Sequence, residues 1–199
     1  MRVIAGTLRG RALKAPPGDA TRPTGARVKE ALFSILGDVS ELAVLDLYAG
    51  SGALAIEALS RGARAAVLVE SARPALACLR DNLTKLGLEG SAKVLPLRVE
   101  TALQQLVRLG PFDLVLCDPP WKDVAAARSV LEALAAAGAF TDAARIALEH
   151  GAKDPPTAPE LSILRVRDER RWGDTAVQLL EPAAAPERPP SEALPKADP

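Results

Sequence analysis

The sequence predicts an α/β fold built on a mostly parallel, doubly wound sheet. Between about residues 44 and 149, short apolar segments of strand length alternate with segments that have helical periodicity. The short segments are largely apolar throughout, as expected for strands that are covered on both faces. The chain has 199 residues, of which 48% are hydrophobic, so one domain with a sizeable core is expected.

The predicted elements follow one another in a regular order. Residues 1–20 form an extended arm or short hairpin, and Thr24 caps a helix that runs to about Leu36 and ends at Gly37. Predicted strands then cover 44–48, 65–69, 93–97, 112–117 and 146–149, and predicted helices cover 54–60, 71–86, 101–109 and 125–137.

The end of the chain has a different pattern. Leu161 to Val166 and Ala176 to Leu180 predict an antiparallel hairpin around a polar turn that includes Asp168 to Asp174. After Glu181 the composition shifts to proline and alanine, which predicts a disordered tail. We therefore expect a basic arm and helix over 1–37, a main domain over 38–181 and a tail over 182–199.

Charge is distributed unevenly along a chain whose formal net charge is zero. Residues 1–30 hold seven basic side chains and two acidic ones, so the remainder is acidic by the same excess. This asymmetry is typical of a basic arm that meets a polyanion, although a solvated surface would give the same pattern.

Cysteine and histidine usage indicates the compartment and argues against a metal. Cys78 and Cys117 lie in apolar segments, so buried free thiols in a reducing cytoplasm are expected. One histidine and two separated cysteines are too few for a zinc site. We see neither a signal peptide nor an apolar stretch long enough to span a bilayer.

The segment Asp46–Ala53 joins the first predicted strand of the alternating part to its helix. Its glycines let a backbone pass close to a ligand, and the amides at the helix start can hold a carboxylate or another anion. Glu70 ends the next strand, where its carboxylate could accept hydrogen bonds from a ribose diol. The spacing also fits a dinucleotide fingerprint. Asp46, however, suits an ammonium group and would oppose a pyrophosphate, which favours S-adenosylmethionine over a nicotinamide cofactor.

Asp118-Pro119-Pro120-Trp121 follows a buried strand and ends it, because neither proline can donate to a sheet ladder. In open α/β folds the carboxyl edge of the sheet is where ligands bind. The Asp118 carboxylate and the Pro119 carbonyl could each accept one N–H of an exocyclic amine, and Trp121 could stack on a flipped base. Each residue alone could be an ordinary turn or core residue.

Taken together, these motifs resemble S-adenosylmethionine-dependent methyltransferases, and the order of segments resembles the bacterial 16S rRNA guanine-966 N2-methyltransferase family. The resemblance runs from about residue 1 to residue 181. Its discriminating part is the basic Arg-Pro-Thr arm. The residues that carry it are Arg2–Gly6, Arg9–Arg11, Arg22–Thr24, Arg27–Glu30, Leu32–Phe33, Asp46–Gly52, Glu57–Gly62, Asp118–Trp121 and Gly173–Thr175.

The resemblance implies a Rossmann-like class I methyltransferase fold, S-adenosylmethionine as cofactor, and 16S rRNA of the small ribosomal subunit as partner. It also implies a cytoplasmic monomer that needs no membrane and no metal. The implied catalytic residues are Asp118, Pro119 and Trp121. The implied cofactor residues are Asp46, Tyr48, Gly50, Ser51, Gly52, Glu70 and Val99, and the implied RNA contacts are Arg9, Arg11, Arg22, Thr24, Arg27 and Lys29.

The sequence departs from the family pattern on the adenine side of the cofactor. Ala72 stands where the family often has an acid, and neither Arg98 nor Glu100 is a clean match for the residue that meets adenine. The motifs also leave other functions open. These are an N6-adenine methyltransferase on RNA or DNA, a non-catalytic RNA-binding module, and a nicotinamide oxidoreductase.

Overall fold

The structure, a computed structural model, describes residues 1–16, 23–153 and 161–183. For Pro23 and Thr24 only the backbone is described. Of the predicted tail over 182–199, only Pro182 and Ala183 fall within the described residues.

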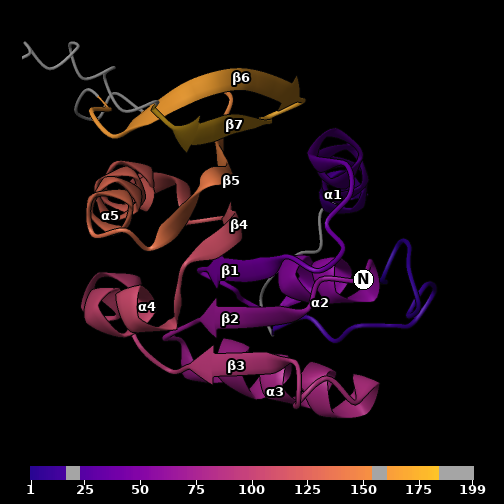
Figure 1. The fold of residues 1–199 in the computed structure, drawn as a ribbon. Coiled ribbons are helices and arrows are strands. Elements are labelled where there is room, and N and C mark those ends of the chain that lie inside the picture. The colour runs from indigo at the N-terminus through magenta and orange to yellow at the C-terminus, as the bar shows by residue number, and fades with distance from the viewer. Residues whose placement is uncertain (17–22, 154–160, 184–199) are drawn as a thin grey trace, which may run out of the picture.

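The described residues form one seven-stranded sheet with the strand order β3-β2-β1-β4-β5-β7-β6 (Figure 1). The first five strands in this order pair in parallel, and β7 and β6 add antiparallel pairs at one edge. The predicted parallel sheet and C-terminal hairpin are therefore confirmed. The strands are β1 (Ala43–Leu47), β2 (Ala65–Val69), β3 (Ala92–Leu95), β4 (Phe112–Cys117), β5 (Phe140–Gly151), β6 (Leu164–Trp172) and β7 (Thr175–Pro182).

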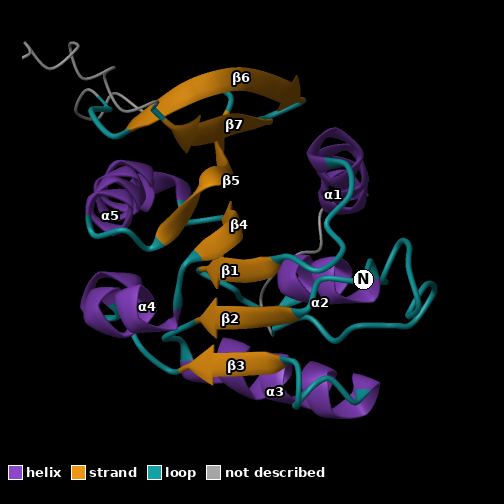
Figure 2. Ribbon diagram, viewed as in Figure 1, coloured by secondary structure: helices purple, strands orange, loops and turns teal. Residues whose placement is uncertain are grey.

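Helices cover both faces of this sheet (Figure 2). Apolar side chains of α1, α2 and α3 pack in one cluster on one face, and those of α4 and α5 pack in a second cluster on the other. The helices are α1 (Pro23–Leu36), α2 (Ala53–Ser60), α3 (Arg73–Leu86), α4 (Leu103–Leu109) and α5 (Val124–Ala136), with short 3₁₀ turns η1 (Val99–Thr101) and η2 (Trp121–Asp123). None of the helices in the described part of the chain is long and apolar enough to cross a membrane.

Helix α3 shows how closely local sequence signals set an element. Pro74 lies in its first turn, where the missing amide costs no hydrogen bond. Leu76, Leu79, Leu83 and Leu86 fall on one face and are all buried. Gly87 then ends the helix in a left-handed conformation with φ of 69°.

The C-terminal hairpin is tighter than the sequence predicted. The polar segment Asp168 to Trp172, expected to lie in the turn, belongs to β6, and the reversal occurs at Gly173 and Asp174. Strand β6 is the edge strand, so its polar side chains remain solvated and pair along the strand, as Arg170 does with Asp168 at 2.8 Å. Polarity at this edge therefore marks exposure of a strand, and the prediction of a long turn was wrong.

The N-terminal arm folds back on itself and joins the core. Arg2 and Ala12 form an antiparallel bridge, and the Val3 amide donates to the Arg11 carbonyl at 3.0 Å. Val3 and Leu13 are buried in the same cluster as α1 and α2. The arm and α1 therefore share one core with the sheet.

Candidate active site

The carboxyl ends of β1 and β4 meet at the point where the strand order reverses. Strand β1 lies between β2 and β4, and Leu47 pairs with Cys117 at their ends. The Asp118 amide donates to the Leu47 carbonyl at 3.4 Å, which continues this contact past the strands. Such a switch point opens a crevice at the sheet edge, where open α/β folds bind their ligands.

The glycine loop between β1 and α2 has the strained backbone that the sequence predicted. Tyr48, Gly50 and Gly52 all have positive φ, of 60°, 55° and 79°. A Cβ on Gly52 would lie 3.3 Å from the Leu68 side chain and 3.4 Å from that of Leu79, so this glycine lets α2 pack closely on the sheet and α3. A Cβ on Gly50 would meet only the Tyr48 carbonyl at 3.9 Å, so the loop is open at that point. Ser51, between the two glycines, is buried.

Glu70 is tied to this loop. Its Oε2 accepts the Gly50 amide at 2.8 Å, and its Oε1 accepts the amides of Ser71 and Ala72 at 2.7 Å each. A carboxylate offers about four acceptor positions, so three amides fix its orientation and leave little further capacity. A ribose diol at this position would share the carboxylate with the backbone.

Asp46 lies deeper than expected. Its side chain is 1% exposed, and its Oδ2 accepts the Ala55 amide at 3.0 Å, which holds the start of α2 against β1. Burial, together with the negative charges of Asp118 and Glu70 and against the effect of the Ala55 amide, raises the pKa of Asp46 to about 8. The ammonium contact expected for Asp46 stays a prediction, and the structure adds a role in positioning α2.

The region expected to meet adenine brings Tyr48 and Glu100 together. The Tyr48 hydroxyl donates to Glu100 Oε1 at 3.4 Å, and Glu100 Oε2 pairs with Arg98 Nε at 3.5 Å. Val99 begins η1, but its side chain is 3% exposed and packs in the core. An adenine contact by Val99 would therefore use its backbone, and Tyr48 and Glu100 are the side chains at hand.

The turn after β4 presents Trp121 toward solvent. The Asp123 amide donates to the Pro120 carbonyl at 2.7 Å, and the indole of Trp121 is 41% exposed. A Cβ on Gly151, at the end of β5, would lie 3.0 Å from Cε3 and 3.1 Å from Cδ2 of that indole. Trp121 therefore rests on the backbone of Gly151, and any side chain at residue 151 would displace it.

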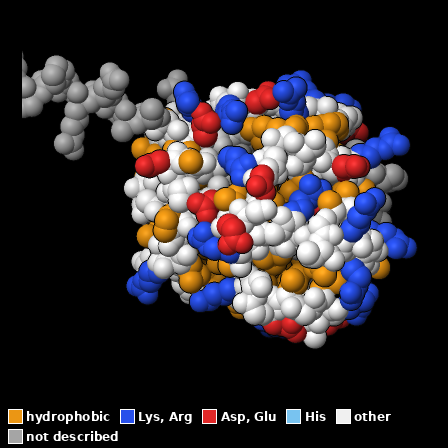
Figure 3. All heavy atoms as spheres, turned by 45° about the vertical axis from the view of Figure 1, so that its right-hand side comes forward, with side chains coloured by type: hydrophobic (Ala, Val, Ile, Leu, Met, Phe, Trp, Pro, Cys, Tyr) orange, Lys and Arg blue, Asp and Glu red, His pale blue; other side chains and the backbone are white. Residues whose placement is uncertain are grey.

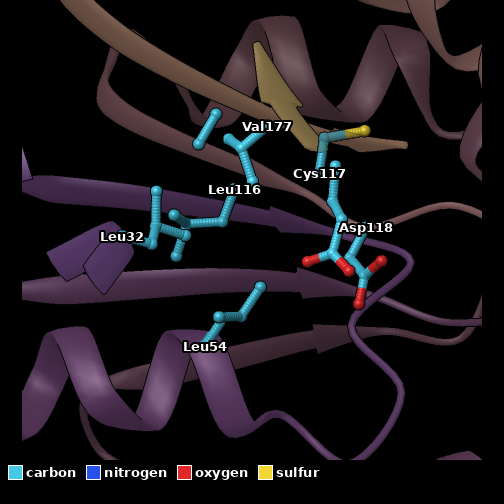
Figure 4. A pocket seen from close by; sticks show the side chains of 8 residues that line it. Leu32, Leu54, Leu116, Cys117, Asp118 and Val177 are labelled. Atoms are coloured by element: carbon cyan, nitrogen blue, oxygen red, sulfur yellow. The ribbon is translucent and has the colours of Figure 1, made fainter. Parts of the chain in front are cut away.

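A small pocket opens beside this turn, and it contains an acid that the sequence analysis did not single out. Asp118 lies at its mouth, past the end of β4 (Figure 4). Glu149 of β5 lines the same pocket, although sequence reasoning saw it only as the end of a strand. The remaining lining is formed by Leu32, Leu54, Leu116, Cys117, Ala147 and Val177. We call Asp46, Glu70, Asp118 and Glu149 the acidic edge.

The predicted RNA contacts divide into exposed and buried residues. Arg9, Arg11 and Arg27 are exposed, and Figure 3 shows Lys and Arg side chains along the margin of the face that carries α1 and the arm. Lys29 is only 7% exposed and pairs with Glu57 at 3.0 Å, so the expectation that it contacts phosphate is corrected. Arg22 lies outside the described residues, and the side chain of Thr24 is not described.

Residues that sequence reasoning missed fasten the arm to the domain. Glu57 of α2 accepts the amides of Ile4 and Ala5 at 2.8 and 3.0 Å and pairs with both Lys29 and Arg61. Burial would raise the pKa of Glu57, but these amides and cations outweigh it, and the pKa is lowered. We call Glu57, Lys29 and Arg61 the arm anchor.

Ser60 and Asn82 complete this attachment. The Ser60 hydroxyl accepts the Leu8 amide at 2.9 Å, and a Cβ on Gly6 would lie 1.7 Å from the Ser60 carbonyl oxygen. The Asn82 amide group bonds both the arm, at the Lys14 carbonyl, and the glycine loop, at the Ser51 carbonyl at 3.0 Å. Asn82 therefore couples the position of the arm to that of the loop.

Comparison with known proteins identifies the family. The family described as "Conserved hypothetical protein 95" matches residues 1–181. The chain belongs to this family. "Ribosomal RNA small subunit methyltransferase D" of Escherichia coli (strain K12) is 41% identical over 124 residues, which are 61% of this chain and 61% of that protein. The protein of the same name from Haemophilus influenzae is 37% identical over 61% of this chain and 64% of its own length, so the match spans less than two thirds of either relative.

Solved structures confirm the fold class. A hypothetical protein of a Thermus species is 31% identical, covers 91% of this chain and 99% of its own, and superposes with a TM-score of 0.76. The fold is the Rossmann-like fold of class I methyltransferases. Both cysteines are free and buried, as expected, and among the described residues no group of three or more His, Cys, Asp or Glu could hold a metal ion.

Proposed function

We propose that this protein transfers a methyl group from S-adenosylmethionine to the exocyclic N2 of a guanine in 16S rRNA of the small ribosomal subunit. The observation that carries the proposal is the Asp118-Pro119 turn, which lies at a switch point next to the glycine loop and beside an exposed indole. The family membership and relatives named as rRNA small subunit methyltransferases support the RNA substrate.

The residues of the glycine loop fit S-adenosylmethionine chemically. The open backbone at Gly50 leaves room for a ligand, and Glu70 is an oriented acceptor for a ribose hydroxyl. Tyr48 and Glu100 supply an aromatic ring and a carboxylate for adenine. When bound, S-adenosylmethionine supplies an electrophilic methyl carbon whose bond to the sulfonium sulfur breaks as the bond to nitrogen forms.

The protein has to hold and deprotonate a weak nucleophile. The lone pair of the guanine amine is delocalised into the ring, so the amine must be oriented and made more pyramidal. The Asp118 carboxylate and the Pro119 carbonyl each accept one N–H, which orients the nitrogen lone pair. As the nitrogen gains positive charge, Asp118 stabilises it and then accepts the departing proton. Trp121 stacks on the flipped base.

The basic arm supplies affinity for RNA. Arg9, Arg11 and Arg27 are exposed and would contact phosphates, whose binding weakens as salt rises. The same role for Arg22 and Thr24 stays a prediction. Because Lys29 holds the arm in place, its contribution to RNA binding would be indirect.

The test is methyl transfer to small ribosomal subunits that lack the modification. We expect labelled methyl groups to enter 16S rRNA and to be recovered as N2-methylguanosine after digestion to nucleosides. Recovery in adenine would support the N6-adenine alternative, and no transfer despite cofactor binding would support a non-catalytic RNA-binding module. A rise in melting temperature with S-adenosylhomocysteine reports the cofactor pocket by mass action. A rise with NAD in its place would support an oxidoreductase.

A further inference from the structure

Glu149 faces the same side of the sheet as Asp118. Cys117 of β4 and Leu148 of β5 are paired in register, and both pack in the cluster on the α4 and α5 face. Leu116 and Ala147, one residue earlier, pack in the other cluster. Because successive side chains alternate between faces, Glu149 projects to the side of Leu116 and Ala147, where Asp118 lines the pocket.

The pocket therefore has two carboxylates on an apolar wall. Its other lining side chains are aliphatic apart from the Cys117 thiol (Figure 4). Ionised carboxylates accept hydrogen bonds and donate none. A base that enters this pocket must present donors to both acids, because an acceptor placed against a carboxylate would leave both groups unsatisfied.

Guanine and adenine differ in what they offer to a second acid. On the Watson–Crick edge of guanine, the N1–H donor lies next to the N2 amine, so two neighbouring acceptors are matched. On adenine the atom next to the N6 amine is the N1 lone pair, which opposes a carboxylate. We propose that Glu149 accepts the N1–H of the target base while Asp118 accepts an N2–H, so Glu149 selects guanine.

This proposal rests on the proposed function and deepens it, because it names the group that decides which base is methylated. The tetrapeptide Asp118–Trp121 binds an amine and stacks on a ring, which suits either purine. Glu149 adds the discriminating contact. A site built to hydrogen-bond a polar group rejects strongly an analogue that lacks that group.

The test compares Glu149→Gln with the wild-type protein on two substrates. Small subunits are reconstituted with 16S rRNA that carries either guanine or 2,6-diaminopurine at the target nucleotide. 2,6-Diaminopurine keeps the N2 amine but replaces N1–H with a lone pair. We expect the wild-type kcat/KM to favour guanine by about ten- to a hundred-fold. Glu149→Gln should lose most of this preference, because an amide can both accept and donate.

Three measurements separate the outcomes. Asp142→Asn, an exposed acid on the same strand, should keep the wild-type preference. The melting-temperature shift with S-adenosylhomocysteine should be unchanged in Glu149→Gln, because the residue contacts the base. If Glu149→Gln does not fold, Glu149→Asp, whose carboxylate is shorter by one methylene, should also lower the preference for guanine.

A preference for guanine that is unchanged in a folded Glu149 variant would overturn the inference, as would equal use of both bases by the wild type. Failure of the wild-type protein to methylate guanine at all would instead overturn the proposed function. These two failures are distinguished by the wild-type reaction on unmodified guanine.

Discussion

Two acidic regions of this protein treat the same chemical group in opposite ways. At the arm anchor, Glu57 is surrounded by two amides and two cations, and its pKa is lowered despite burial. At the acidic edge, Asp46 is equally buried, but its neighbours include two further acids, and its pKa is raised to about 8. The difference indicates that the fold itself neutralises the arm anchor, whereas the acidic edge gathers negative charge where a ligand would bind.

The largest expected effect is on chemistry at the acidic edge. Asp118→Ala should lower the methyl-transfer rate by about 10²- to 10⁴-fold, because the variant loses both an N–H acceptor and the group that takes the proton. Single-turnover transfer to unmodified small subunits measures this rate. Its melting temperature and its response to S-adenosylhomocysteine should stay close to those of the wild type.

A nearby acid provides the control for Asp118. Asp123 lies in the 3₁₀ turn that follows the prolines, and Asp123→Ala should leave the transfer rate within a few-fold of the wild type, a margin well below the loss of a general base. Wild-type activity in Asp118→Ala would remove this carboxylate from the mechanism. A large fall in its stability would place it in the same class as Glu57.

The next effect concerns stability at the arm anchor. Glu57→Gln removes the charge that pairs with Lys29, which is 7% exposed, and leaves a buried ammonium without its counterion. Breaking a buried pair in this way costs about 3–5 kcal/mol, or roughly 10 °C in melting temperature for a chain of this size. Thermal unfolding of the purified variant measures the loss. An unchanged melting temperature would show that the arm does not depend on Glu57.

These two regions also differ in how far the sequence predicted them. The motifs Asp46–Gly52 and Asp118–Trp121 are contiguous, so strand ends and glycine spacing placed them correctly at one sheet edge. Glu149 and Glu57 belong to no local motif. Their roles arise because β5 pairs with β4 and because the arm, more than fifty residues earlier in sequence, folds over α2.

The misplaced residues have a similar cause. Lys29 was expected on an RNA-contacting surface because basic residues cluster in the first thirty positions, but helical periodicity places it next to buried Val28 on the inner side of α1. The segment Asp168 to Trp172 looks like a turn because it is polar, yet edge strands are solvated on one face and tolerate such sequences. In both cases tertiary context decides between local readings that composition leaves equal.

The two regions should respond to pH with opposite signs. Because the pKa of Asp46 is raised on folding, the folded state holds a proton that the unfolded chain releases, and stability falls as pH rises from about 4 toward 8. Because the pKa of Glu57 is lowered, its contribution is present above its ordinary pKa and is lost as pH falls through the folded value.

Melting temperature measured across pH 5–8 tests the Asp46 half of this prediction. Asp46→Asn can still accept the Ala55 amide but carries no ionisable proton, so its melting temperature should fall less over this range than that of the wild type. Asp142→Asn should follow the wild-type profile. Parallel profiles for wild type and Asp46→Asn would show that Asp46 is ionised in the fold throughout this range.

The smallest effect is expected where the arm meets the domain in water. Lys14 pairs with Asp81 of α3 at 2.7 Å, so this pair joins the same two parts of the molecule as Glu57 does, but both side chains are more than half exposed. Solvent and salt screen such a pair, and side-chain entropy offsets most of the gain. Asp81→Asn should therefore change the melting temperature by about 1 °C or less. A loss similar to that of Glu57→Gln would show that charge at the arm boundary stabilises the protein whether or not it is buried, and the contrast between the two regions would then rest on ligand binding alone.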